Sequence, residues 1–183
     1  MLTILHAEAA RDNGDKLSDG AYLIKQFCDW LSATQVSIAF QSANWFVPLV
    51  QTAHIISIAI LLTSVYVVSF RLIGLTRGIQ PLATIAVKLA PWIWASLCVL
   101  LVTGVLLIVT EPARELLNWV FRTKMLLVSL LAGILAVVQL RVRRSPDYWS
   151  ESLARRRAGR AIGLLCVTLG ACIVIAGRWI AYV

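Results

Sequence analysis

Four long apolar runs alternate with short polar stretches along the chain. They occupy residues 46–69, 91–110, 117–139 and 161–183. A helix of about 20 apolar residues crosses the roughly 30 Å hydrocarbon core of a bilayer. The pattern therefore predicts an all-α protein, with an integral membrane bundle of four transmembrane helices in residues 45–183.

The stretch before the first run has a different pattern. Residues 1–20 are polar and are predicted to form an N-terminal tail. In residues 21–33 apolar side chains recur at helical spacing between polar ones, and residues 34–44 continue this pattern more weakly. Because residues 21–44 hold no run long enough to span, we predict a short amphipathic helix at the membrane surface. Packing of this segment against a soluble partner is the alternative interpretation.

Prolines and short polar stretches set the predicted ends of the spans. Pro48 lies in the first turn of the first span, where its missing N–H is tolerated. Pro91 is predicted to begin the second span, after a connection at residues 76–90. Residues 111–116 are predicted to form a tight turn, which makes the second and third spans antiparallel neighbours.

Glycines recur every seven residues in the fourth span, at Gly163, Gly170 and Gly177. This repeat places them on one face of a helix, because seven residues make about two turns. Small residues let two helices approach closely within a membrane. We therefore predict a helix-packing seam along this face.

Composition supports the membrane assignment and leaves little room for a separate soluble domain. The chain has 183 residues, of which 60% are hydrophobic and 14% charged. Soluble proteins are about half apolar and about a quarter charged. The net charge of +8 lies mostly in residues 140–160, beside two apolar spans. We interpret this charge as a determinant of topology and a partner for anionic lipid headgroups, not as a nucleic-acid surface.

The distribution of Lys and Arg predicts how the bundle is oriented. The connection after the first span carries Arg71, Arg77 and Lys88, and the connection after the third span carries an arginine cluster. The turn at residues 111–116 and the N-terminal tail show no such excess. Cytoplasmic loops are enriched in basic residues. We therefore predict a multi-pass protein of the bacterial inner membrane with both termini on the outer, periplasmic side.

The first span carries the candidate functional residues. His54 is the one histidine within an apolar run. Gln51, His54 and Ser57 fall on one side of this helix, as do two more polar residues, Ser64 and Arg71. A polar stripe on a spanning helix is expected to face the interior of the bundle.

Depth in the membrane brings polar groups from other spans to the same level. At ~1.5 Å per residue, His54 lies roughly 10–12 Å from the outer face. Lys124 on the third span and Thr103-Gly104 on the second lie at a similar depth, and Gln51 lies closer to the surface. The predicted cofactor-binding residues are His54, Gln51, Lys124 and Gly104, with His54 as the candidate metal ligand. Snorkelling of Lys124 to the near interface is the competing interpretation.

Several short motifs carry a resemblance to known proteins. They are Trp45-x-x-Pro48-x-x-Gln51-x-x-His54, Phe70-Arg71-Leu72-Ile73-Gly74-Leu75, Leu89-x-Pro91, Thr103-Gly104 and Asn118-x-x-Phe121-x-x-Lys124. At these residues the chain resembles an uncharacterised family of bacterial four-helix membrane proteins. It is more distantly similar to the membrane domain of copper-resistance D proteins. The resemblance covers residues 45–125 and implies the four-helix membrane fold, but carries no activity with it.

Two functions fit the candidate site directly. The chain could be a non-catalytic subunit or anchor of a larger membrane complex, or of a homo-oligomer, with His54 hydrogen-bonded between helices. Alternatively, His54 could bind haem b or, with less support, copper, because neutral imidazole is a ligand for both metals. The spans supply one histidine, so a second haem ligand must come from another copy, a partner, His6 or Lys124. Met1 and Met125 are the only methionines, which disfavours a copper path.

A transporter or proton-relay protein is the third function considered, with His54 and Lys124 as titrating groups. The absence of acidic residues from the four spans argues against most cation-coupled carriers. A stand-alone enzyme is disfavoured because the spans hold no Ser/His/Asp set, phosphate loop or carboxylate pair.

Overall fold

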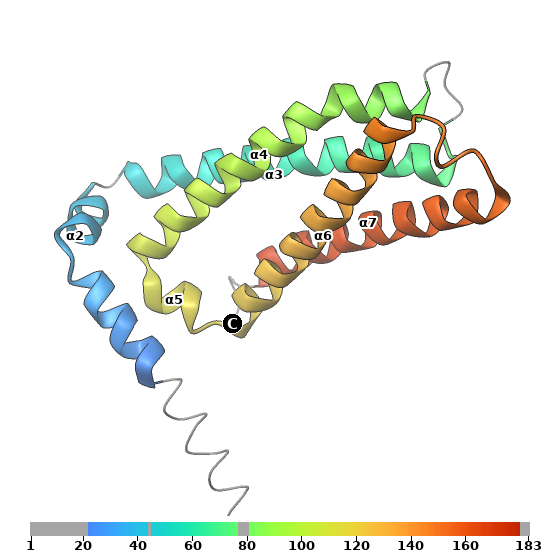
Figure 1. Cartoon of the computed structure of the whole chain (residues 1–183). Helices are drawn as coiled ribbons and strands as arrows, with labels where there is room; N and C mark the ends of the chain where they lie inside the picture. Colours follow the sequence, from blue (N-terminus) through green and yellow to red (C-terminus); the bar gives the residue numbers. More distant parts are fainter. Residues whose placement is uncertain (1–21, 44, 77–80, 180–183) are drawn as a thin grey trace, which may run out of the picture.

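A computed structural model of the chain describes residues 22–43, 45–76 and 81–179. The described residues form helices and no strands, which confirms the all-α prediction (Figure 1). Four helices within them are long and apolar enough to cross a membrane, so the chain is a multi-pass membrane protein. They are α3 (Phe46–Ile73), α4 (Leu82–Thr110), α6 (Trp119–Arg144) and α7 (Leu153–Trp179).

Three short helices complete the described chain. Residues 22–32 form one helix, and α2 (Gln35–Ser42) follows it before the first span. The predicted tight turn between the second and third spans contains the short helix α5 (Pro112–Leu116). We call the end of the bundle that carries α5 the α5 end, and the opposite end the arginine end.

The helix α4 begins at Leu82, well before the predicted start at Pro91, which lies inside the helix. Pro81 precedes the first turn with φ −64°, so the earlier proline marks the true start. A proline inside a helix costs about 3 kcal/mol. Burial of Ala86 and Ala90, which are 1% and 2% exposed, helps to offset this cost.

The other helix ends also differ from the predicted spans. The helix α7 begins at Leu153 and not near residue 161, because Ser152 Oγ accepts a hydrogen bond from the Arg155 N–H and helps to cap the first turn. The arginine-rich stretch assigned to a loop is therefore partly helical. At the other extreme, α3 continues to Ile73, where Gly74 ends it with φ 88°, a left-handed conformation that suits glycine.

The helix α3 lies at the centre of the packing. It contacts α4 and α7 extensively, and α6 packs mainly on α7, whereas α4 and α6 make few contacts. Those contacts join the first half of α4 to the second half of α6, as in the hydrogen bond of 2.6 Å from Trp94 Nε1 to Gln139 Oε1. Figure 1 shows α4 and α6 diverging towards the α5 end. The main core cluster consists of Leu61, Val65, Ile93, Leu131, Leu135, Cys166, Leu169 and Ile173.

The predicted glycine seam forms over part of its length. A Cβ on Gly163 would lie 2.8 Å from the backbone oxygen of Ser69, and one on Gly170 would lie 2.8 Å from Tyr66 Cε1. Both glycines therefore bring α7 into close contact with α3. Gly177 is different, because its nearest neighbour is Lys124 Nζ on α6, 4.0 Å from the same constructed position.

The segment before the first span is attached to the end of α4. Ser37 Oγ donates to the carbonyl oxygen of Val109, and Gln41 Nε2 donates to that of Thr110, both at 2.8 Å. These bonds satisfy carbonyls that the last turn of a helix leaves without intrahelical partners. In the preceding helix Tyr22, Leu23, Phe27 and Trp30 are at least half exposed. An apolar face of this kind is typical of a helix that rests on a bilayer surface.

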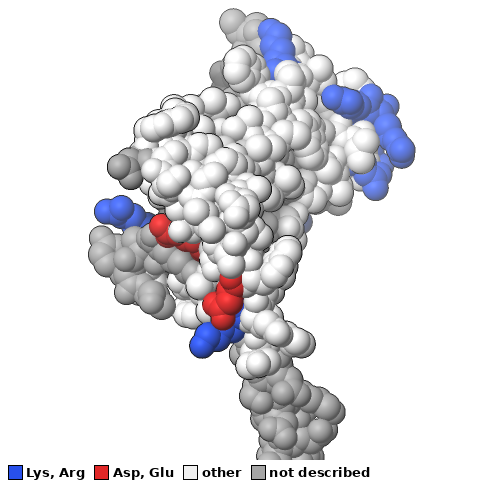
Figure 2. All heavy atoms as spheres, turned by 90° about the vertical axis from the view of Figure 1, so that its left-hand side faces the viewer, with Lys and Arg blue, Asp and Glu red and all other residues white. Residues whose placement is uncertain are grey.

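The outer surface is largely uncharged. Figure 2 views the molecule from the side of α2 and shows white surface over most of this face, with Lys, Arg, Asp and Glu confined to separate groups. Many large apolar side chains are exposed on all four long helices, including Leu101 at 68% and Leu126 at 66%. An apolar surface of this extent fits contact with lipid acyl chains.

The tight contact at Gly163 predicts a large effect of a single methyl group. Gly163→Ala should destabilise the fold by ~1–3 kcal/mol, because its Cβ would overlap the Ser69 backbone. Gly133 of α6 is the matched control, since a Cβ there meets nothing within 4 Å. Gly133→Ala should be neutral or stabilising by up to ~1 kcal/mol. Denaturant unfolding in detergent micelles measures both, and equal stabilities of the two variants would contradict the seam.

Candidate functional site

The imidazole of His54 is held between the first two spanning helices. His54 lies on α3 and is half-buried. Its Nδ1 is 2.7 Å from Thr103 Oγ1 of α4, which is itself 7% exposed. The prediction that these residues share one depth agrees with this hydrogen bond. Thr103 therefore fixes the position of the ring.

The hydroxyl of Thr103 contacts both the imidazole and its own helix. Its Oγ1 lies 2.7 Å from the carbonyl oxygen of Val99 and 2.7 Å from His54 Nδ1, and its single proton can serve one of them. When that proton goes to Val99, Nδ1–H donates to Oγ1 and the neutral ring keeps a free lone pair on Nε2. A nitrogen in this state can bind a metal or accept a hydrogen bond from a ligand.

Gly104 lies directly beside the imidazole ring. A Cβ on Gly104 would be 3.9 Å from His54 Cε1, which is ordinary van der Waals contact. The ring edge between the two nitrogens therefore lies along the backbone of α4. An alanine would fit at this position, but a larger side chain would fill the space next to Nε2.

Lys124 links this site to the α5 end and to α7. Its side chain is half-buried and interacts electrostatically with His54 and with Glu115 of α5. Its Nζ lies 4.0 Å from the position that a Cβ on Gly177 would take. The ammonium group thus lies next to the last turns of α7.

The polar stripe on α3 faces the interior over only part of its length. Ser57 and Ser64 are buried, at 6% and 5% exposed, as the stripe predicts. Gln51 is exposed, whereas its neighbour Val50 is buried. The contact that orients the imidazole comes from Thr103. In the sequence, the only indication of a contact between Thr103 and His54 was their similar predicted depth in the membrane.

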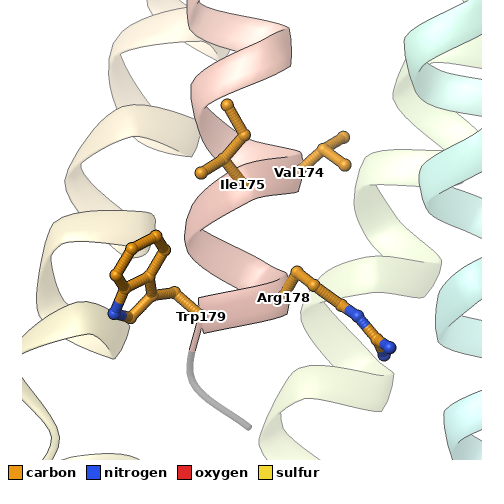
Figure 3. A pocket seen from close by; sticks show the side chains of 4 residues that line it. All are labelled: Val174, Ile175, Arg178 and Trp179. Atoms are coloured by element: carbon orange, nitrogen blue, oxygen red, sulfur yellow. The ribbon is translucent and has the colours of Figure 1, made fainter. Parts of the chain in front are cut away.

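A cavity of about 600 Å³ opens on the last turns of α7. It is lined by Val174, Ile175, Arg178 and Trp179. Figure 3 shows Val174 and Arg178 directed to the side of α4, and Trp179 to the side of α6. Gly177 belongs to the same turn, so Lys124 Nζ lies near this cavity.

The ligand set at His54 contains one strong metal ligand. Within the described ranges, no group of three or more His, Cys, Asp or Glu side chains could hold a metal ion. His54 is the imidazole that the spanning helices supply, and a neutral imidazole can bind haem iron or copper. His6, considered as a second ligand, falls outside the described residues.

A second polar pair was not anticipated from the sequence. Gln139 of α6 is 7% exposed, and its Oε1 accepts the hydrogen bond from Trp94. The one sequence feature that could have indicated this pair is the amide side chain of Gln139 at the end of the third apolar run. This pair fastens α4 to α6 away from His54, so it contributes to packing and not to the candidate site.

Comparison with known proteins gives a family without an assigned function. No curated protein and no solved structure matches the chain, so the resemblance to copper-resistance D proteins has no support. Residues 27–183 match a family of unknown function (DUF6644). This match covers most of the sequence, and the chain belongs to that family.

Proposed function

We propose that the chain is a membrane subunit or anchor of a larger complex, and that it binds a ligand around His54. The observation that supports this most is that two ionisable side chains of spanning helices, His54 and Lys124, are both half-buried in the half of the bundle nearer the α5 end. A charged side chain within a spanning helix is costly unless it is paired or lines a polar cavity. A ligand or partner subunit on this side of the bundle would shield both groups from lipid.

The proposed orientation follows from the charge at the two ends. The arginine end carries Arg141, Arg143 and Arg144 of α6 together with the arginines of α7. Basic residues are enriched on the cytoplasmic side of membrane proteins. We therefore place the arginine end in the cytoplasm of a bacterium, and the α5 end and the His54 site on the periplasmic side of its inner membrane.

A second candidate function is binding of haem b, or of copper, for membrane electron transfer. The specific observation in its favour is the free Nε2 of His54, which the Thr103 hydrogen bond leaves available. Hydrogen bonding of the second ring nitrogen is the usual way in which proteins orient a histidine ligand. The described residues supply one axial ligand, so a second copy or a partner would complete a six-coordinate haem.

Transport or proton relay has less support than either function. The helices α3, α4, α6 and α7 contain no Asp or Glu. Carriers that couple to cations normally hold such carboxylates within the membrane.

The subunit proposal predicts a protein neighbour on one face of the bundle. A photo-crosslinking amino acid at Ile175, which lines the cavity and is 58% exposed, should capture one discrete polypeptide in intact membranes. Leu101 is the matched control, because it is 68% exposed and lies away from the cavity lining. Lipid adducts alone from both positions would contradict the proposal.

The cofactor candidate predicts a spectroscopic difference between three variants. Titration of the purified protein with haem b should produce a Soret band that His54→Ala abolishes. Thr103→Val keeps the size of the side chain and should weaken binding about 10–100-fold, because the ring loses its orienting bond. Gln51→Ala should bind as wild type, since Gln51 is exposed. A wild-type protein without a Soret band, and without copper by elemental analysis, would rule this candidate out.

A further inference from the structure

The arginine end concentrates positive charge at the junction of two spanning helices. Residues 141–160 contain seven arginines and two acidic residues, Asp147 and Glu151, which leaves a net charge of +5 (seven minus two). Repulsion among like charges opposes such a cluster unless anions approach it. The arginines are Arg141, Arg143, Arg144, Arg155, Arg156, Arg157 and Arg160.

Tyr148 brings together two of these arginines from different helices. Arg141 Cζ of α6 lies 5.2 Å from the centroid of the Tyr148 ring, and Arg155 Cζ of α7 lies 4.5 Å from it. Both distances are within the range of cation–π attraction. The Tyr148 ring therefore contacts one guanidinium group from each of the two helices.

The loop that carries Tyr148 is fixed in place. Its neighbour Trp149 packs with the core cluster near Leu72 and contacts the position of Gly159, where a Cβ would lie 3.3 Å from Trp149 Cε3. The Tyr148 and Trp149 rings meet edge to face with centroids 5.0 Å apart. The Tyr148 N–H also donates to the Ser145 carbonyl oxygen at 3.1 Å. The position of Tyr148 is thus determined by packing and not by the arginines alone.

The two guanidinium groups are only partly neutralised. Arg155 forms an exposed ion pair with Glu151, a kind of pair that contributes ~0–1 kcal/mol. In the part of the chain that the structure describes, Arg141 forms no ion pair. A planar guanidinium offers paired N–H donors that match the oxygens of a phosphate group.

The surroundings of the pair identify the source of the phosphate. Leu140, directly before Arg141, is 55% exposed, and Val137, one turn earlier, is 52% exposed. The basic pair therefore borders the apolar surface that faces lipid chains. A phospholipid can place its phosphate at the arginines and its acyl chains along this surface.

We propose that Arg141 and Arg155, held together by Tyr148, form a binding site for the phosphate of an anionic phospholipid headgroup. Basic pockets between spanning helices are known to select anionic lipids. This site lies at the opposite end of the bundle from His54, so it does not depend on the ligand or partner proposed there.

The test compares variants by native mass spectrometry of detergent-purified protein titrated with phosphatidylglycerol or phosphatidylcholine. Wild type should retain phosphatidylglycerol preferentially. Arg141→Gln should lower that retention about tenfold, the equivalent of losing one charge-assisted hydrogen bond. Arg157→Gln removes the same charge from an arginine outside the Tyr148 pair and should change retention less than about twofold.

Substitutions of the aromatic ring separate a built site from a merely basic surface. Tyr148→Leu keeps every charge and should still lose most of the preference, whereas Tyr148→Phe keeps the ring and should retain it. Glu151→Gln should strengthen retention, because it frees Arg155 from its ion pair. Thermal unfolding checks that each variant is folded.

Three outcomes would overturn the proposal. Equal losses for Arg141→Gln and Arg157→Gln would show a generic basic surface. Equal lipid retention by folded Tyr148→Leu and folded Tyr148→Phe would remove the role of the ring. Full displacement of the lipid by millimolar inorganic phosphate would show a free-anion site instead of a lipid site.

Discussion

The close contact between α7 and α3 at Gly163 and Gly170 sets the geometry of the whole bundle. With no Cβ at these positions, α7 lies against the backbone and side chains of α3. In a membrane, van der Waals packing of this kind replaces much of the hydrophobic driving force between helices. Because α3 already holds α4 on another side, α6 is left to pack mainly on α7. The divergence of α4 from α6 accompanies this packing, in which α6 lies on α7 and makes few contacts with α4.

This divergence explains why polar groups gather at one end of the bundle. Near the arginine end α4 and α6 meet, and the indole N–H of Trp94 donates a hydrogen bond to the buried amide of Gln139. Towards the α5 end they separate, so His54 receives its partner from α4, through Thr103, and Lys124 extends towards α7. A histidine between packed helices needs one orienting bond, and Thr103 supplies it without using both ring nitrogens. The site is thus built from the contact of α3 with α4, and its open side comes from the position of α6.

Hydrophobic patterning was enough to predict the fold class, because spanning helices are defined by runs of apolar residues. It could not predict where helices end when packing outweighs a local signal. Pro91 was interpreted as the start of the second span. The helix instead begins at Leu82 and continues past Pro91, and Ala86 in its first turns is buried. Depth along the spans brought His54 and Thr103 together correctly. The helical wheel also placed Gln51 on the inward stripe, whereas Gln51 is exposed, and its role in ligand binding stays a prediction. The Tyr148 pairing depends on a loop conformation that no periodicity encodes.

The two ends of the bundle use charge in different ways, and the membrane accounts for the difference. At the arginine end the cations lie beyond the last apolar turn, where water and headgroups solvate them and many can be tolerated together. At the α5 end the ammonium group of Lys124 extends from within a spanning helix, where a charge needs a nearby partner. Lys124 interacts electrostatically with Glu115 and with His54. Glu115 lies on the short helix α5, so the connection between α4 and α6 supplies an opposite charge for this lysine.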